Sequence, residues 1–194
     1  SLKYDPHWRD VGNLKGAFST YGNLLDSLAE DSKLLMEDIT SSVKDAVNNA
    51  KKAAEDALTN PAADLLDAKK QLNNALSDIA QGKIDIDGNL SDMNQQVKDI
   101  PETVFDRDSL SNVFASKDDA KSRVSNAFQN MKTLEDMDIK KLEDAADPFD
   151  LDDSFREMFE SKKEALENRK TMDDNENIIN DLMEDVNAKL AGGS

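Results

Sequence analysis

The chain contains no cysteine and a single histidine, His7, among its 194 residues. Without cysteine it forms no disulfide, no zinc–thiolate site and no thiol nucleophile, although the redox compartment stays open. One histidine cannot supply the paired Glu-x-x-His ligands of a di-iron helical bundle, and it excludes most imidazole-based acid–base schemes. The seven glycines follow neither a phosphate-loop nor a dinucleotide-binding spacing. We therefore expect a protein that is not an enzyme and that has no catalytic residues, no cofactor and no metal site.

Positive charge is also scarce, because 24 Lys and Arg residues face 41 Asp and Glu residues and give a net charge of −17. This excess leaves no basic surface for nucleic acid and no general attraction to anionic lipid. Aromatic residues make up 5% of the chain, and no apolar stretch is long enough to cross a bilayer. With 38% hydrophobic and 34% charged residues, the composition favours long helices with narrow apolar seams and solvated outer faces.

The clearest positive feature is an apolar stripe with alternating steps of three and four residues near the N-terminus. Its members are Val11, Leu14, Phe18, Tyr21, Leu25, Leu28, Ser32, Leu35 and Ile39. This repeat predicts a long amphipathic helix over residues 10–58 that packs on partner helices. Beyond Ile39 the stripe loosens to Val43, Val47, Ala50 and Ala54, which predicts a stutter in the repeat.

Weaker stripes predict three further long helices, over residues 61–100, 108–146 and 150–190, after an irregular segment at residues 1–9. Their boundaries fall at the helix-starting and helix-ending pairs Asn60-Pro61, Ile100-Pro101 and Asp147-Pro148.

Two places favour interruptions within these helices. Gly82 and Gly88 flank a stretch of poor helix formers and favour a break in the second helix. Ser116 with Asp119 resembles a capping box and favours a restart in the third helix. The centre of the fourth helix, residues 162–177, is poor in apolar residues, so we expect thin packing there.

Short connections force neighbouring helices to run antiparallel. The fold class we predict is therefore all-α, an elongated antiparallel (up-down-up-down) four-helix bundle with coiled-coil-like packing. It forms a single domain over residues 1–191, and we interpret residues 192–194 as a linker or tag remnant.

Two Asp-rich segments are candidate cation sites, Asp85-Ile86-Asp87-Gly88-Asn89 and Asp147–Asp153. Neither has the glycine position or the twelfth-position Glu of an EF-hand loop, so we expect no dedicated calcium site. Asn89-Leu90-Ser91 is a glycosylation sequon that matters only in a secreted protein.

These observations predict a non-enzymatic interaction protein that binds a macromolecular partner through its acidic outer surface. The alternative is an amphipathic-helix carrier of lipid or a small apolar ligand that opens at its hinges. We expect a protein partner of unknown identity and no nucleic acid. Because the four narrow apolar stripes can be buried against one another within one chain, we expect a monomer, with a homodimer as the alternative. The start at Ser1, the sequon and the solubilising charge favour secretion over a cytoplasmic location.

Overall fold

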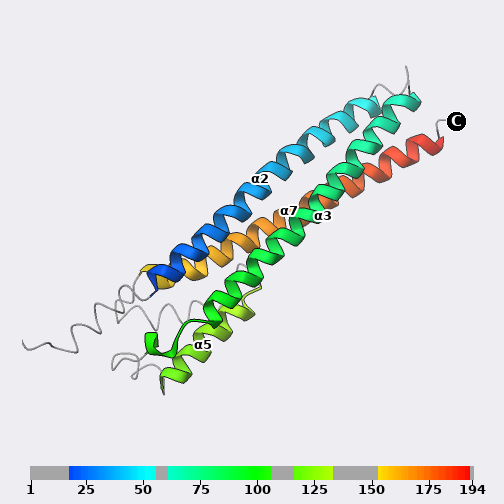
Figure 1. Ribbon diagram of the computed structural model, residues 1–194. Coiled ribbons are helices and arrows are strands. Elements are labelled where there is room, and N and C mark those ends of the chain that lie inside the picture. The colour runs from blue at the N-terminus through cyan, green and yellow to red at the C-terminus, as the bar shows by residue number, and fades with distance from the viewer. Residues whose placement is uncertain (1–17, 56–60, 106–115, 133–152, 193–194) are drawn as a thin grey trace, which may run out of the picture. The chain divides into compact units, whose positions relative to one another are not determined.

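A computed structural model describes residues 18–55, 61–105, 116–132 and 153–192 (Figure 1). The described helices are α2 (Ser19–Glu55), α3 (Pro61–Lys98), the 3-10 helix η2 (Glu102–Phe105), α5 (Lys117–Asn130) and α7 (Asp153–Gly192). No strand occurs in these ranges. The predicted all-α class, built from four packed α-helices, is confirmed.

The buried side of α2 follows a regular seven-residue repeat over the whole helix. Its members are Phe18, Gly22, Leu25, Ala29, Ser32, the half-buried Met36, Ile39, Val43, Ala46, Ala50 and Ala53. The predicted stutter after Ile39 is wrong, because Ala46 and Ala53 take the buried positions while Val47 and Ala54 stay half-buried. Alanines therefore continue the seven-residue repeat in the part of α2 where larger apolar residues no longer occupy its positions.

Helix α3 is continuous from Pro61 to Lys98, so the predicted break between Gly82 and Gly88 is wrong. Gly82 is buried at the position where Ile39 of α2 packs. Asp85 accepts a hydrogen bond from Gln81 one turn earlier, at 3.1 Å. Tertiary packing therefore outweighs the low helix propensity of this stretch.

The chain divides into two compact units. Unit 1 comprises Ser1–Glu30 and Asn89–Leu166, and unit 2 comprises Asp31–Gly88 and Glu167–Ser194. Helices α2, α3 and α7 each contribute residues to both units. A single domain over residues 1–191 stays a prediction.

The core of unit 1 is built from large aromatic and sulfur-containing side chains. Phe18 and Phe105 meet edge to face with ring centroids 5.8 Å apart, and Phe128 and Phe159 do so at 5.5 Å. Around them lie Leu25, Met93, Val97, Ile100, Val124, Met131 and Met158, all buried. Edge-to-face pairs of this kind add to the burial of the rings themselves.

Helix α5 begins as the Ser116–Asp119 pair predicts, because the Ser116 side chain accepts a hydrogen bond from the Asp119 backbone N–H at 3.1 Å. It ends at Asn130, and residues 131–132 are not helical. The prediction of one helix over 108–146 is therefore wrong in its extent. Lys162 of α7 explains the end point, since its ammonium group donates to the backbone carbonyls of Phe128 and Gln129. A cation at the last carbonyls of a helix stabilises its C-terminus.

In unit 2, α2, α3 and α7 pack together as three helices (Figure 1). Contacts of Ile39 with Gly82 and of Asn49 with Gln71 show that α2 and α3 are antiparallel. The Arg169–Asp87 and Lys83–Glu176 contacts show the same for α3 and α7.

It follows that α7 runs parallel to α2, which differs from the predicted up-down-up-down alternation. That alternation assumed a short turn at Asp147-Pro148. The chain instead has residues 131–152 between α5 and α7, and a connection of that length does not impose an antiparallel neighbour.

The centre of α7 is well buried rather than thinly packed. Lys162, Ala165, Asn168, Met172 and Asn175 are all buried there, so polar side chains fill positions that sequence patterning assigns to solvent. Other expectations lie outside the described residues, namely the 1–9 segment, Asn60 and Asp147-Pro148. Gly192 is the last residue of α7, and the linker interpretation of 192–194 stays a prediction.

Candidate functional site

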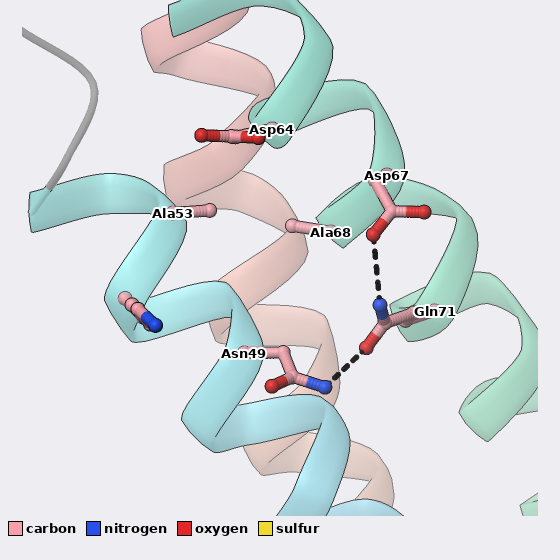
Figure 2. Close-up of a pocket in the computed structure, with 7 residues that line it drawn as sticks. Asn49, Ala53, Asp64, Asp67, Ala68 and Gln71 are labelled. Atoms are coloured by element: carbon pink, nitrogen blue, oxygen red, sulfur yellow. Dashed lines mark hydrogen bonds between the residues drawn. The ribbon is translucent and has the colours of Figure 1, made fainter. Parts of the chain in front are cut away.

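A hollow with a volume of about 370 Å³ opens between α2 and α3 in unit 2. We call it the polar groove, and its lining residues are Asn49, Lys52, Ala53, Asp64, Asp67, Ala68 and Gln71. Figure 2 shows its walls, with Asn49 and Ala53 on α2 and the acidic side chains on α3. Polar lining of this kind suits a charged or hydrogen-bonding ligand better than an apolar one.

Small residues create the space for the groove. Ala53 and Ala68 are buried core positions of α2 and α3, and their methyl groups face each other across the seam (Figure 2). A larger apolar residue at either position would fill the seam to its edge. The flanking polar side chains therefore lie around an open hollow.

A chain of hydrogen bonds crosses the groove from α2 to α3 (Figure 2). The side-chain amide of Asn49 donates to Gln71 Oε1 at 2.7 Å, and Gln71 Nε2 donates to Asp67 Oδ2 at 2.9 Å. These hydrogen bonds orient the Gln71 amide and occupy one oxygen of the Asp67 carboxylate, and no described residue donates to the other oxygen, Oδ1.

Negative charge prevails in the polar groove, where two carboxylates accompany one ammonium group. Asp64 and Lys52 make no hydrogen bond or ion pair with other described residues. Unpaired carboxylate oxygens are acceptors, and they recognise ammonium or guanidinium donors by charge-assisted hydrogen bonds.

An ion-pair network joins α3 to α7 elsewhere in unit 2. Asp173 accepts from Lys83 Nζ at 2.8 Å and from Arg169 Nη1 at 2.7 Å, while Arg169 Nε also reaches Asp87 at 2.8 Å. Lys83 is shared with Glu176 at 3.0 Å. All five groups are engaged with one another, so the network stabilises the α3–α7 contact and offers no unpaired charge to a ligand.

The network shifts the pKa values of Lys83, Arg169 and Asp173. Hydrogen bonds to Asp173 and Glu176 raise the pKa of Lys83. The hydrogen bond from Lys83 lowers the pKa of Asp173. Desolvation raises this pKa, but the hydrogen bond from Arg169 lowers it further, so the net shift is downward. For Arg169 desolvation is the largest single influence and lowers the pKa, but the bonds to Asp87 and Asp173 outweigh it and the pKa is raised. Each charged form is therefore favoured at neutral pH.

Polar side chains also enter the core seam of α7 in unit 2. Asn175 Nδ2 donates to Thr40 Oγ1 at 3.0 Å. Asn168 is 5% exposed, and its Nδ2 has no hydrogen-bond partner among the residues that the structure describes. An unsatisfied buried amide is destabilising, so Asn168 is a weak point of this core.

One pair of carboxylates comes together in unit 1. A hydrogen bond with Asp118 raises the pKa of Glu102, which lies in η2. Both side chains are exposed. Catalytic carboxyl pairs act in clefts that exclude water, and this pair lies at the surface.

The residues singled out from the sequence lie in unexceptional places. Asp85 and Asp87 belong to the continuous helix α3, where they accept from Gln81 and Arg169 rather than forming a cation-binding loop. Asn89 is half-buried within the same helix, a poor acceptor geometry for a glycan. His7 and most of Asp147–Asp153 lie outside the described residues.

The residues of the polar groove were missed by sequence reasoning. A usable signal was present, since Ala53 and Ala68 fall at core positions on either side of the Asn60-Pro61 helix start. Small core residues near a helical hairpin leave room at the seam, and Asn49, Asp64 and Gln71 flank that room. The choice between a filled and an open seam depends on side-chain packing, which periodicity does not report.

The comparisons add no assignment, because no protein-family model, curated protein or solved structure matches the chain. Within the ranges that the structure describes, no helix is long and apolar enough to cross a membrane. Across those same ranges, no three or more His, Cys, Asp or Glu side chains gather to hold a metal ion.

Proposed function

We propose that this chain is a non-enzymatic helical-bundle protein that binds a basic protein partner through its acidic outer surface. The observation that carries the proposal is the outer face of α7 in unit 2, which we call the acidic face. Asp174, Asp181, Glu184 and Asp185 are exposed there, and none of them forms an ion pair with described residues. No Lys or Arg occurs between Lys170 and Lys189 to neutralise them.

The charge of this face defines the class of partner. A surface with one sign of charge raises the local concentration of oppositely charged molecules and accelerates their association. Nucleic acids and anionic lipids carry the same sign as the acidic face and are repelled. A basic protein surface is complementary, and the net charge of −17 extends the attraction beyond the contact itself.

The carrier alternative has less support. A carrier that opens would be favoured by thin packing at the centre of the fourth helix, but Ala165, Met172 and Asn175 are buried there. The large exposed apolar residues are Leu24, Leu34, Leu66, Ile84 and Ile178. They are spaced along three helices and single exposed apolar residues of this kind are ordinary. An extracellular location stays a prediction, and the half-buried Asn89 gives it no added support.

The test begins with cross-linking of the chain to its neighbours in its native source, followed by purification of the partner and calorimetry of the pair. The test variant combines Asp174→Asn, Asp181→Asn, Glu184→Gln and Asp185→Asn. The matched control removes the same charge from α2 through Asp31→Asn, Glu37→Gln, Asp38→Asn and Asp45→Asn, all exposed positions.

We expect the α7 variant to weaken binding about tenfold or more, equivalent to about 1.4 kcal/mol, and salt to do the same. The α2 variant should have a smaller effect. The proposal is refuted if the affinity of the partner changes neither with salt concentration nor in either charge variant.

A further inference from the structure

We propose that the polar groove of unit 2 receives a lysine or arginine side chain of the protein partner. This inference rests on the proposed function and gives the electrostatic attraction one specific contact. The reasons lie in the shape of the groove, in its free acceptors and in the order of its hydrogen bonds.

The groove offers the two chemical surfaces that a long basic side chain needs. The facing methyl groups of Ala53 and Ala68 give an apolar contact for an aliphatic stem (Figure 2). Asp64 and the Oδ1 atom of Asp67 give acceptors for the charged head that no other described residue engages. Lys and Arg side chains bind in this divided manner, with the stem on apolar surface and the head on polar groups.

The hydrogen-bond chain prepares the site before a ligand arrives. Asn49 holds Gln71, and Gln71 in turn holds Asp67 through one oxygen. The Asp67 carboxylate therefore loses little side-chain freedom when it binds a cation, which lowers the entropic cost of the contact.

Other ligand classes fit the polar groove less well. A divalent metal ion needs more oxygen ligands than the Asp64 and Asp67 carboxylates supply. An anion meets two like charges and one ammonium group, that of Lys52. An apolar molecule would strip water from Asn49 and the carboxylates without replacing their hydrogen bonds.

The chain contains its own control for this site. On the exposed side of α3, Gln81 donates to Asp85 at 3.1 Å, so the same pair of residue types occurs at the same spacing as Asp67 and Gln71. Asp85 does not line the groove. Binding that depends on the shape of the groove should therefore change the environment of the Gln71 side chain and not that of Gln81.

The experiment is a nuclear magnetic resonance titration of the nitrogen-15-labelled full chain. The probes are N-acetyl-arginine amide and N-acetyl-lysine amide, with N-acetyl-glutamine amide as the uncharged control. We expect saturable shifts of the side-chain amides of Asn49 and Gln71 with both basic probes, and small, unsaturated shifts at Gln81.

Two double variants locate the binding. Asp64→Asn with Asp67→Asn should weaken binding of the basic probes about tenfold, whereas Asp78→Asn with Asp85→Asn should change it less than about twofold. Circular dichroism on both variants checks that the fold is retained.

Equal shifts at Gln71 and Gln81, equal losses in the two variants, equal binding of the uncharged probe, or no binding of the basic probes would overturn the groove assignment. Each of these results leaves the proposed function standing, because that proposal is tested separately by the salt dependence and the α7 variant. If the basic probes bind but partner binding depends neither on salt nor on the α7 charges, the proposed function is wrong instead.

Discussion

Unit 1 and unit 2 draw on the same three long helices but fill their cores differently. Unit 1 uses interlocking phenylalanines and methionines, and its buried lysine, Lys162, has several hydrogen-bond acceptors around it. Unit 2 alternates aliphatic residues with alanine and Gly82, and its buried Asn168 leaves a donor unsatisfied. A satisfied polar group helps to define a core, whereas an unsatisfied one weakens it. The predictions below test that difference.

The largest effect is expected in unit 1, for Lys162→Met. The ammonium group donates to Asn94 Oδ1 at 2.8 Å and to the Phe128 and Gln129 carbonyls, and it lies 4.7 Å from the Phe128 ring centroid. Methionine keeps the apolar stem but removes the donor from one buried acceptor, the Phe128 carbonyl, and from two half-buried ones. We expect a loss of about 3 kcal/mol in the free energy of unfolding, measured by urea denaturation.

Lys163 is the matched control, since it is exposed and adjacent on the same helix. Lys163→Met should change the free energy of unfolding by less than about 0.5 kcal/mol. If both variants unfold at the same urea concentration, the capping role of Lys162 is wrong.

The two buried asparagines of unit 2 should respond in opposite directions to leucine. Asn168→Leu removes an unsatisfied amide and should stabilise the chain by about 1 kcal/mol, because no hydrogen bond is lost. Asn175→Leu breaks the 3.0 Å bond to Thr40 and should destabilise by about 1 kcal/mol. Parallel urea denaturation of the two variants measures the difference. A destabilised Asn168→Leu chain would indicate that the amide has a partner after all.

The glycines of α3 give a smaller contrast. A Cβ atom at position 88 would meet nothing within 4 Å, so Gly88→Ala should stabilise by about 0.5–1 kcal/mol through helix propensity. At position 82 the Cβ would overlap Ile39 Cδ1, and the gain in propensity should be cancelled or reversed. Thermal unfolding of both variants measures the contrast. Ile39→Val combined with Gly82→Ala should restore part of the stability, and its failure to do so would argue against this packing.

The smallest effect concerns the ion-pair network of unit 2. Because the pKa of Asp173 is lowered in the folded chain, its contribution is present above the ordinary Asp pKa of 3.8 and is lost as the pH falls through the lowered value. Its side chain is 50% exposed, so we expect Asp173→Asn to cost less than about 1 kcal/mol at neutral pH. Urea denaturation at neutral and strongly acidic pH should show this cost shrinking. A cost that stays constant would exclude a charge effect.

The contribution of Lys83 has the opposite pH dependence. Its raised pKa means that its stabilising effect is complete below 10.5 and is lost as the pH rises through the higher folded value. The shifts of Lys83 and Asp173 therefore both favour the charged form at neutral pH.

Periodicity predicted what depends on the spacing of apolar residues along one helix. The helix class and the seam through Leu25 and Ile39 follow from it. The starts at Pro61 and Lys117 agree with two local signals, the Asn60-Pro61 pair and the Ser116–Asp119 capping box. What it could not predict depends on contacts between helices. The end of α5 is set by Lys162, far along the chain, and the continuity of α3 is set by the packing of Ile39 over Gly82.

The sequence pattern alone does not identify the candidate site, for the same reason. The Asn49–Gln71 hydrogen bond joins residues on two helices, and neither residue has a distinctive local signature. The polar groove depends on the size of Ala53 and Ala68, which a pattern of apolar and polar residues treats as ordinary core positions.

The glycine beneath Ile39 also fixes how far α3 can slide along α2. A shift of α3 by one seven-residue repeat would bring either Ala75 or Asn89 opposite Ile39, and both carry the Cβ atom for which this crossing has no room. Repetitive apolar seams of this kind otherwise accept several alignments at similar energy. A missing side chain thus selects one alignment, and it does so without adding any contact.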